Sequence, residues 1–213
     1  MTPYYCFNVK LQDPEGKWYG PDVFFHTLRE DTKPEIDCVL LFLHKTHRYR
    51  VYTEEAGSQT LCQSLDCRMG IWRDTAEQLP CQGCEHAQWK NHTPPACKLC
   101  YSFVGVDLED SGPFIVTAKS TSLSPARQFL NKYFLRKLQG KDLPLYVYQS
   151  HLGLIQPKGT YSVLSLERGQ ANSPGDIRHF AELTRELLAS KRLDFTFEQP
   201  EVVEDAEAED LPF

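Results

Sequence analysis

Six of the eight cysteines of this chain lie in one segment, and they constrain its fold more than any other feature. Two pairs have the spacing C-x-x-C, which lets a tight turn present two thiolates to one tetrahedral Zn²⁺ at ~2.3 Å. Gly83, inside the first pair, supplies the backbone freedom that such a turn favours. The sequence therefore predicts a structural zinc ribbon, inserted at about residues 61–100, with the ligands Cys81, Cys84, Cys97 and Cys100.

The same segment offers other ligands. Cys67 or Cys62 can replace Cys100 in the quartet, and a second ion shared with His86 or His92 is a further option. A closed set of four thiolates indicates a structural metal, because catalytic zinc keeps one coordination position open. In an intracellular chain such a cluster is more economically explained by a metal than by disulfides.

No catalytic motif accompanies the cysteines. Pro80-Cys81-x-x-Cys84 is half of a nucleobase-deaminase signature, but the upstream His-x-Glu that this chemistry needs is missing. The chain also lacks the metalloprotease motif HExxH, the phosphate-cradling GxxxxGK[ST] and the GxSxG elbow. We therefore expect a protein that is not an enzyme.

The remaining sequence is dominated by short runs of β-branched and aromatic residues separated by Gly, Pro and acidic turns, which predict strands. These runs are 4–11, 23–29, 38–44, 47–53, 101–108, 113–120, 145–155 and 160–167. Ser124-Pro125 and Ser173-Pro174 each place an N-cap and a first-turn proline before an apolar stripe, so we expect helices ending near Gly140 and Lys191. The expected fold is α+β, mainly β: an elaborated OB-like barrel with the inserted zinc ribbon and two helices.

The acidic side chains are concentrated at the C-terminus. Seven of them and no basic side chain lie from Glu198 to Phe213, so residues 1–197 are close to neutral although the whole chain has a net charge of -6. Such a segment is too polar to fold alone, and we expect one domain over 1–197 and a disordered tail over 198–213. Neither a secretory signal nor an apolar stretch of spanning length is evident, which indicates a cytoplasmic protein that does not enter a membrane.

Asp210, Leu211, Pro212 and Phe213 close the tail with an aromatic ring and a terminal carboxylate behind a run of acids, a combination typical of C-terminal peptide recognition. This ending resembles the tip of bacterial single-stranded DNA-binding proteins (SSB). The resemblance implies that these four residues dock the host replication, recombination and repair proteins that recognise SSB tips. It also suggests a bacterial cell as the setting, with a phage or plasmid as the source of the gene.

A zinc module within an OB-like body is similar to the single-strand binding protein of T-even phages. That family has histidine in its metal site and lacks the Pro-Phe end, whereas the quartet expected here is all cysteine.

Basic and aromatic residues of the fourth predicted strand are the main candidates for binding DNA. In a strand, Arg48, Arg50 and Tyr52 share one face and Tyr49 lies on the other, so phosphate contacts and a base-stacking ring can line one groove. The alternative is an exposed strand with a solvated basic face. The full candidate set is Lys45, Arg48, Tyr49, Arg50, Tyr52, Lys119 and Arg127.

The sequence thus favours a protein that coats single-stranded DNA without sequence preference and recruits partners through its tip. Two other functions stay open: an adaptor or inhibitor that binds the tip-recognising enzymes without contacting DNA, and a zinc-dependent nucleic-acid enzyme. The sequence does not separate coating from strand annealing, and it leaves homo-oligomerisation open.

Overall fold

A computed structural model describes residues 3–7, 22–53, 57–133, 143–157, 161–190, 193 and 195. The predicted tip at 210–213 and the side chain of Tyr52 lie outside the described residues.

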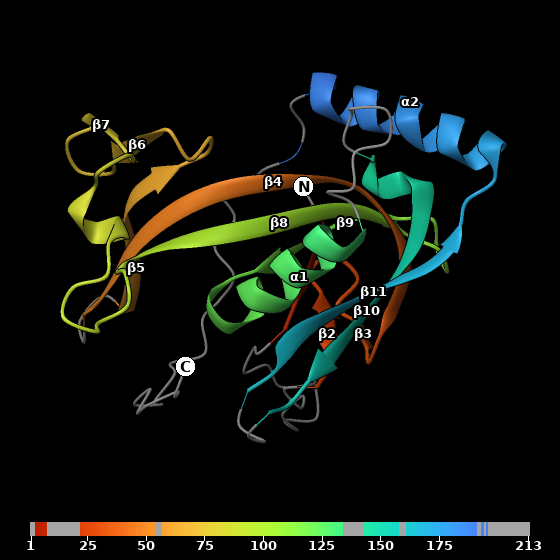
Figure 1. The fold of residues 1–213 in the computed structure, drawn as a ribbon, viewed down its shortest axis with the longest axis horizontal. Helices are drawn as coiled ribbons and strands as arrows, with labels where there is room; N and C mark the ends of the chain where they lie inside the picture. Colours follow the sequence, from red (N-terminus) through yellow and green to blue (C-terminus); the bar gives the residue numbers. More distant parts are fainter. Residues whose placement is uncertain are drawn as a thin grey trace.

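The described part of the chain is dominated by one mixed, open sheet of eleven strands (Figure 1). The strands are β1 Tyr4–Cys6, β2 Phe24–His26, β3 Thr32–Lys33, β4 Ile36–Thr53, β5 Gly57–Ser64, β6 Met69–Trp72, β7 Gln78–Pro80, β8 Cys97–Asp107, β9 Pro113–Ala118, β10 Tyr148–Ile155 and β11 Val163–Ala171. Their order is β3-β2-β1-β9-β8-β4-β5-β6-β7, and β10 pairs with both β11 and β4. All pairings are antiparallel except that of β1 with β9.

In the described ranges five helical segments accompany the sheet: α1 Leu123–Tyr133, α2 Pro174–Ser190 and the single 3₁₀ turns η1 Glu85–Ala87, η2 Ser120–Ser122 and η3 Leu145–Val147. Ser173 caps α2, because its Oγ accepts a hydrogen bond from the N–H of Asp176 at 3.2 Å and donates one to the Asp176 carboxylate. None of the described helices is long and apolar enough to cross a membrane.

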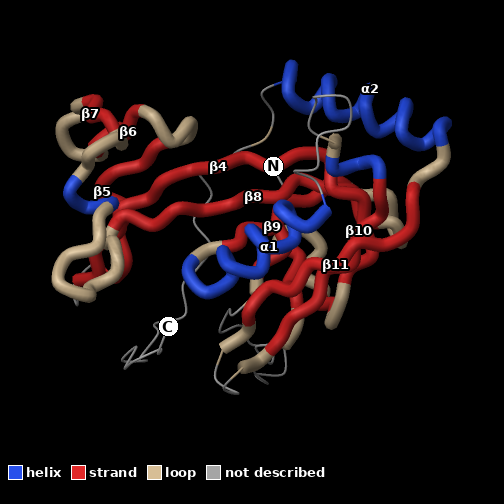
Figure 2. Tube along the Cα trace, viewed as in Figure 1, coloured by secondary structure: helices blue, strands red, loops and turns tan. Residues whose placement is uncertain are grey.

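Strand β4 is the backbone of the molecule. It runs through 18 residues and pairs with β8 along the register from Cys38↔Asp107 to Tyr49↔Cys97. Beyond the body, β4 and β8 continue as a two-stranded neck that carries β5, β6, β7 and η1, which we call the arm (Figures 1 and 2). The expected insertion is therefore a strand-rich arm on a long ribbon.

The two faces of the sheet have different covers. One face packs against α1 and the β10–β11 hairpin through a core that includes Phe103, Val116, Phe129 and Leu152, and we call it the α1 face. The opposite face, the α2 face, packs Val104 and Ile115 against partly buried residues that include Leu187, Leu193 and Phe195. Phe180 and Leu183 of α2 cover Val39 and Leu41 on the same side.

A register shift between Leu40 and Phe42 fixes which side chains of the neck belong to which face. Leu43 packs on the α1-face core, so alternation along β4 places Lys45, His47 and Tyr49 on that face. The residues that alternate with them, Thr46, Arg48 and Arg50, face the α2 side.

The prediction of a mainly-β α+β protein with two helices is confirmed. The described strands form an open sheet and show no closed barrel. The predicted strands 38–44 and 47–53 are one strand, β4, because no Gly, Pro or acidic turn separates them. The expected helices begin within one residue of Ser124 and Ser173, and the first is described only to Tyr133.

Candidate metal centre and nucleic-acid interface

The first C-x-x-C pair forms the tight turn that its spacing predicts. The N–H of Cys84 donates to the carbonyl of Cys81 at 3.2 Å, and Gly83 has φ +80. A hydrogen bond from residue i+3 to residue i with positive φ at i+2 is the pattern of a type II turn. The turn puts the side chains of Cys81 and Cys84 next to each other.

Gly70 brings a third thiol to this turn. A Cβ atom added at Gly70 would lie 2.7 Å from Sγ of Cys62 and 3.8 Å from Sγ of Cys81. The glycine thus opens the space in which these two sulfurs approach each other from β5 and from the turn after β7. Neither Gly70 nor Cys62 was in the predicted quartet, although Cys62 was one of its alternatives.

The second C-x-x-C pair differs from expectation, because it begins strand β8 and forms no turn. Cys97 pairs with Tyr49 and Cys100 with Thr46 in a regular register, and residues three apart in a strand point to opposite faces. Cys97 therefore lies on the α1 face of the neck with Cys62, which pairs with Tyr49 from the other side. Cys100 is buried on the α2 face.

The electrostatic surroundings of the thiols divide in the same way. The pKa of Cys97 is raised to about 12, mainly by burial, and Cys84, Cys62, Cys81 and, least, Cys100 contribute to this rise. Burial is the main cause of the raised pKa of Cys62, and Cys81 and Cys84 add to it. Burial also raises the pKa of Cys100, but its other neighbours are mainly Arg48 and Lys119, which lower it. Burial is the main cause of the raised pKa of Cys67, and among the other cysteines Cys81 and Cys100 add to it.

Four thiols, those of Cys62, Cys81, Cys84 and Cys97, thus gather on the α1 face of the arm. Within the described residues, no three His, Cys, Asp or Glu side chains are arranged to hold a metal ion, and all eight cysteines are free thiols. In their chemistry the four donors fit structural zinc, for which thiolate is a preferred ligand. Because Gly70 has no Cβ, Sγ of Cys62 can lie at this position, beside Sγ of Cys81.

His86 is packed among rings. Its imidazole stacks on Tyr49 with centroids 4.3 Å apart, and Trp72 meets both rings edge-on. Tyr49 and Trp72 therefore form a small aromatic core of the arm, so Tyr49 is partly withdrawn from the role in base stacking that its sequence context predicts. Trp89 is 59% exposed.

Three of the predicted DNA-binding cations lie together on the α2 face. The positive charges of Arg48, Lys119 and Arg50 all lower the pKa of the Cys100 thiol, and Arg48 has the largest effect of the three. They come from β4 and from the residue that follows β9. The structure therefore brings Lys119 close to the two arginines of β4.

Phe195, which follows α2 in the chain, lies over this cluster. Arg48 is only 9% exposed, and its Nη2 donates to the carbonyl of Phe195 at 2.5 Å. The Phe195 ring stacks on His44 with centroids 4.0 Å apart and an interplanar angle of 25°. An aromatic ring and a carbonyl oxygen of Phe195 thus cover His44 and Arg48 on the α2 face.

The other predicted cations are on the α1 face. Lys45 and Arg127 are exposed and lie over the ring of Tyr101, with Nζ 5.0 Å and Cζ 5.9 Å from its centroid. The seven candidates therefore do not form one surface. Tyr101 was not predicted, and the signal that points to it is its register opposite Lys45.

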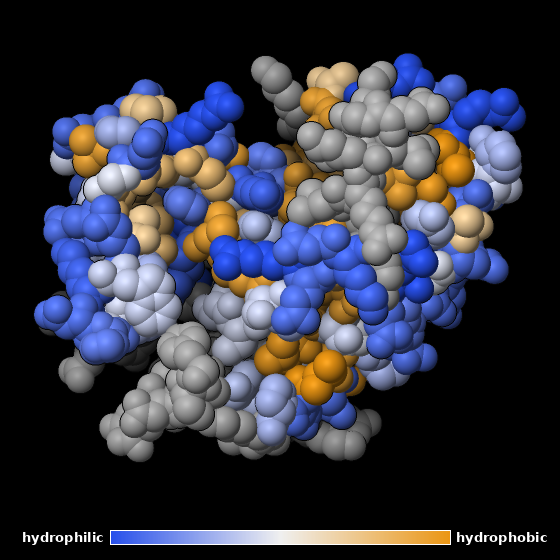
Figure 3. Space-filling model, viewed as in Figure 1, coloured by the Kyte–Doolittle hydropathy of each residue, from blue (hydrophilic) through white to orange (hydrophobic). Residues whose placement is uncertain are grey.

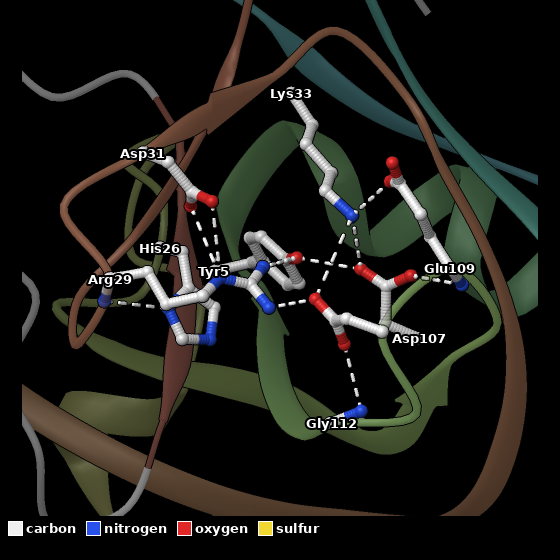
Figure 4. A network of polar contacts seen from close by, with 9 residues as sticks. Tyr5, His26, Arg29, Asp31, Lys33, Asp107, Glu109 and Gly112 are labelled. Atoms are coloured by element: carbon white, nitrogen blue, oxygen red, sulfur yellow. Dashed lines mark hydrogen bonds and ion pairs between the residues drawn. The ribbon is translucent and has the colours of Figure 1, made fainter.

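A polar network that the sequence did not reveal ties β1, the β2–β3 turn and the β8–β9 turn together (Figure 4). The Tyr5 hydroxyl donates to Asp107 at 2.7 Å and accepts from Nη2 of Arg29 at 2.5 Å. Lys33 bridges Asp107 and Glu109 at 2.8 and 2.5 Å, and Arg29 also pairs with Asp110. The residues of this network are far apart in sequence, so no local motif reveals it.

Burial opposes ionisation of Asp107, but the hydrogen bonds from Lys33 and Tyr5 outweigh it, and its pKa is lowered. Burial is the main cause of the raised pKa of Tyr5, and its hydrogen bond to Asp107 adds to it. The phenol therefore stays protonated and the carboxylate charged, as a structural hydrogen bond requires. The mutual saturation of donors and acceptors indicates a fastening between turns.

The fold and the clusters define an α+β, mainly-β protein with a large mixed open sheet, a cysteine-bearing arm and a basic cluster on one face. No family model matches the chain, and neither the curated proteins nor the solved structures searched include a match.

Proposed function

We propose that this chain is a single-stranded DNA-binding protein that acts without sequence preference and whose groove crosses the α2 face of β4, β8 and β9. The observation that carries the proposal is the gathering of Arg48, Arg50 and Lys119 around the buried Cys100. Phosphate binding needs such a local group of cations, even when the body as a whole is near neutral.

The chain order supports an OB-type core. The strands β4, β8 and β9 follow one another as a meander, α1 comes next, and the β10–β11 hairpin returns so that β10 pairs with β4. In OB folds the face of the second and third strands and the loops between strands 1–2 and 4–5 bind oligonucleotides. On this mapping β8 and β9 are strands 2 and 3, and the arm fills the loop between strands 1 and 2.

The contacts of Phe195 support a ligand with flat rings and anionic oxygens on the α2 face. His44 receives a flat ring in a stacked geometry, and Arg48 receives a carbonyl oxygen. Stacking on aromatic side chains is worth ~1–3 kcal/mol per base and tolerates any base, while arginine binds phosphate oxygens. We infer that single-stranded DNA competes with Phe195 for these positions.

For the arm we propose one structural Zn²⁺ held by Cys62, Cys81, Cys84 and Cys97. This set keeps three members of the predicted quartet and uses Cys62 in place of Cys100, because the strand geometry of β8 turns Cys100 to the other face. The ion would fix the arm at the mouth of the groove and do no chemistry. That the protein is not an enzyme stays a prediction.

The role of Asp210, Leu211, Pro212 and Phe213 in docking replication, recombination and repair enzymes also stays a proposal. It rests on the residues alone, because the tip lies outside the described part of the chain.

The test is fluorescence anisotropy of labelled single- and double-stranded oligonucleotides with the full chain across a salt series. We expect tight, salt-sensitive binding that prefers single strands, and a loss of affinity in Arg50→Gln and Lys119→Gln. Each lost phosphate contact should lower the slope of log K against log salt by about 0.7. Arg185→Gln, on the exposed side of α2, is the matched control and should bind normally.

Absence of binding by a folded, zinc-loaded protein would refute the proposal and favour the adaptor, which uses the tip without contacting DNA. Normal binding by both groove variants would leave the function standing but place the groove elsewhere.

A further inference from the structure

A second basic site lies on the α1 face, away from the proposed groove. It consists of Lys45 on β4, Arg127 on α1 and Tyr101 on β8 between them in the fold. The ring of Tyr101 is buried, at 7% exposure, whereas both cations are exposed. Three separate segments of the chain thus converge to hold two positive charges at one place.

No carboxylate neutralises these two cations. Across the described residues, neither Lys45 nor Arg127 forms an ion pair with a carboxylate, in contrast to the fully paired Arg29 and Lys33 of the Asp107 network. The first turn of α1 contains no acidic residue. Two like charges that share a ring without an acid between them repel each other, and an anion bound to both would relieve this repulsion.

The site is next to the proposed groove along the chain although it is on the other face. Lys45 and Arg48 lie three residues apart in β4, so they project from opposite sides of the same neck. Among the described strands, β5 flanks the two-stranded neck at Arg48 and β9 ends beside it at the level of Lys45, so a flexible polymer that leaves the α2 face near Arg48 reaches Lys45 by passing round the neck. Hydrophobic atoms are visible between the arm and the body on the side that carries α1 (Figure 3).

We propose that Lys45 and Arg127 form a second phosphate-binding site, which takes the backbone of the same DNA strand after it has passed round the neck. The inference rests on the proposed function. It adds a path for the strand and predicts that full affinity needs an oligonucleotide long enough to reach both faces. Tyr101 positions the two cations, because cation–π contact holds each of them over its ring.

The experiment measures binding of labelled oligothymidylates of increasing length by the full chain, with Lys45→Gln, Arg127→Gln and the double variant. We expect the double variant to lower the salt slope by about 1.4, corresponding to two phosphate contacts, on long oligonucleotides. On oligonucleotides too short to leave the α2 face it should bind as the wild type does. Lys132→Gln, an exposed cation of the same helix, is the control and should be unchanged at every length.

Equal salt slopes for the wild type and the double variant at every length would overturn the second site. If Arg50→Gln still weakened binding in that case, the proposed function would stand without it. No binding by the wild type at any length would instead remove the proposed function itself. A loss in the double variant that is the same for short and long strands would also refute the path, because it would place both cations in the primary groove.

Discussion

At the scale of single residues, the best-defined chemistry is the network around Asp107. This carboxylate is 2% exposed, yet it receives hydrogen bonds from the Tyr5 hydroxyl, the Lys33 ammonium and the N–H of Glu109. A buried charge is tolerated only when it is paired in this way. Each donor therefore stabilises the junction of β1, β2 and the β8–β9 turn.

Tyr5→Phe removes one donor to Asp107 and one acceptor for Arg29 without changing the packing of the ring against Phe24 and Phe114. We expect a loss of about 1–2 kcal/mol in the free energy of unfolding, because a buried carboxylate loses a partner but keeps Lys33. Urea denaturation measures it. Tyr146→Phe is the control, and an equal effect there would show that the loss is not specific to the network.

His151 gives a prediction about pH. Its Nδ1 lies 2.9 Å from Asp37 and its Nε2 3.4 Å from Glu35, and the hydrogen bond to Asp37 is the main cause of its raised pKa, with Asp37, Glu35 and Glu167 adding by charge. A raised pKa means that the folded state binds the proton more tightly than the unfolded state. The stabilisation is therefore complete below the ordinary histidine pKa of about 6.5 and is lost as pH rises through the raised value.

His151→Gln should accordingly lower the melting temperature at about pH 5.5 and leave it close to the wild-type value at pH 8. Thermal unfolding across this pH range measures the difference. His179→Gln, an exposed histidine on α2, should change neither end of the range. If the melting temperatures of the wild type and of His151→Gln differed by the same amount at every pH, the pairing of His151 with Asp37 and Glu35 would be contradicted.

At the scale of elements, the arm shows which local structures a short sequence motif can predict. The C-x-x-C spacing and Gly83 were enough to predict the turn at 81–84, because a tight turn is a local structure. The same spacing at 97–100 is found in a strand, because β8 continues its pairing with β4 up to Cys97, and long-range pairing overrides a local preference. Gly70 as the neighbour of Cys62 depends on how β6 folds back, which no sequence pattern contained.

The zinc ligands are tested by metal content. We expect one zinc per chain in the purified wild type, loss of zinc in Cys62→Ala and retention in Cys100→Ala. The reason is that Cys62 shares the face and the charge interactions of Cys81, Cys84 and Cys97, whereas Cys100 faces Arg48. Atomic emission spectrometry gives the stoichiometry, and circular dichroism checks that each variant is folded. Zinc lost from Cys100→Ala but kept by Cys62→Ala would restore the quartet predicted from sequence.

The strands and helices of the body were largely predictable, because alternation of apolar residues and Ser-Pro helix starts are local signals. The candidate DNA surface was predictable only as a set of residues. Alternation along β4 correctly separates Arg48 from Tyr49, but which face receives Lys119 or Arg127 follows from tertiary pairing with Cys100 and Tyr101. The covering of Arg48 by Phe195 joins residues 147 positions apart and has no sequence signal.

At the scale of the whole molecule, the position of Phe195 links the body to the acidic C-terminal segment. The last described residue contacts His44 and Arg48 on the α2 face, and six acidic side chains follow after Pro200. A chain of negative charges that starts at a basic cluster competes with phosphate for the same cations. The competition is screened by salt, since the Debye length is about 10 Å at 0.1 M ionic strength.

A protein that ends at Pro200 should therefore bind single-stranded DNA as tightly as the full chain or more tightly, with the largest gain at low salt. It keeps Phe195, so the contacts to His44 and Arg48 persist and the change isolates the charge of the segment. Anisotropy across the salt series measures it, and Phe213→Ala in the full chain is the control, because it removes the tip ring and keeps all the acids. Weaker binding after truncation would mean that the acidic segment assists DNA binding, and the proposed competition between its acids and phosphate would then be wrong.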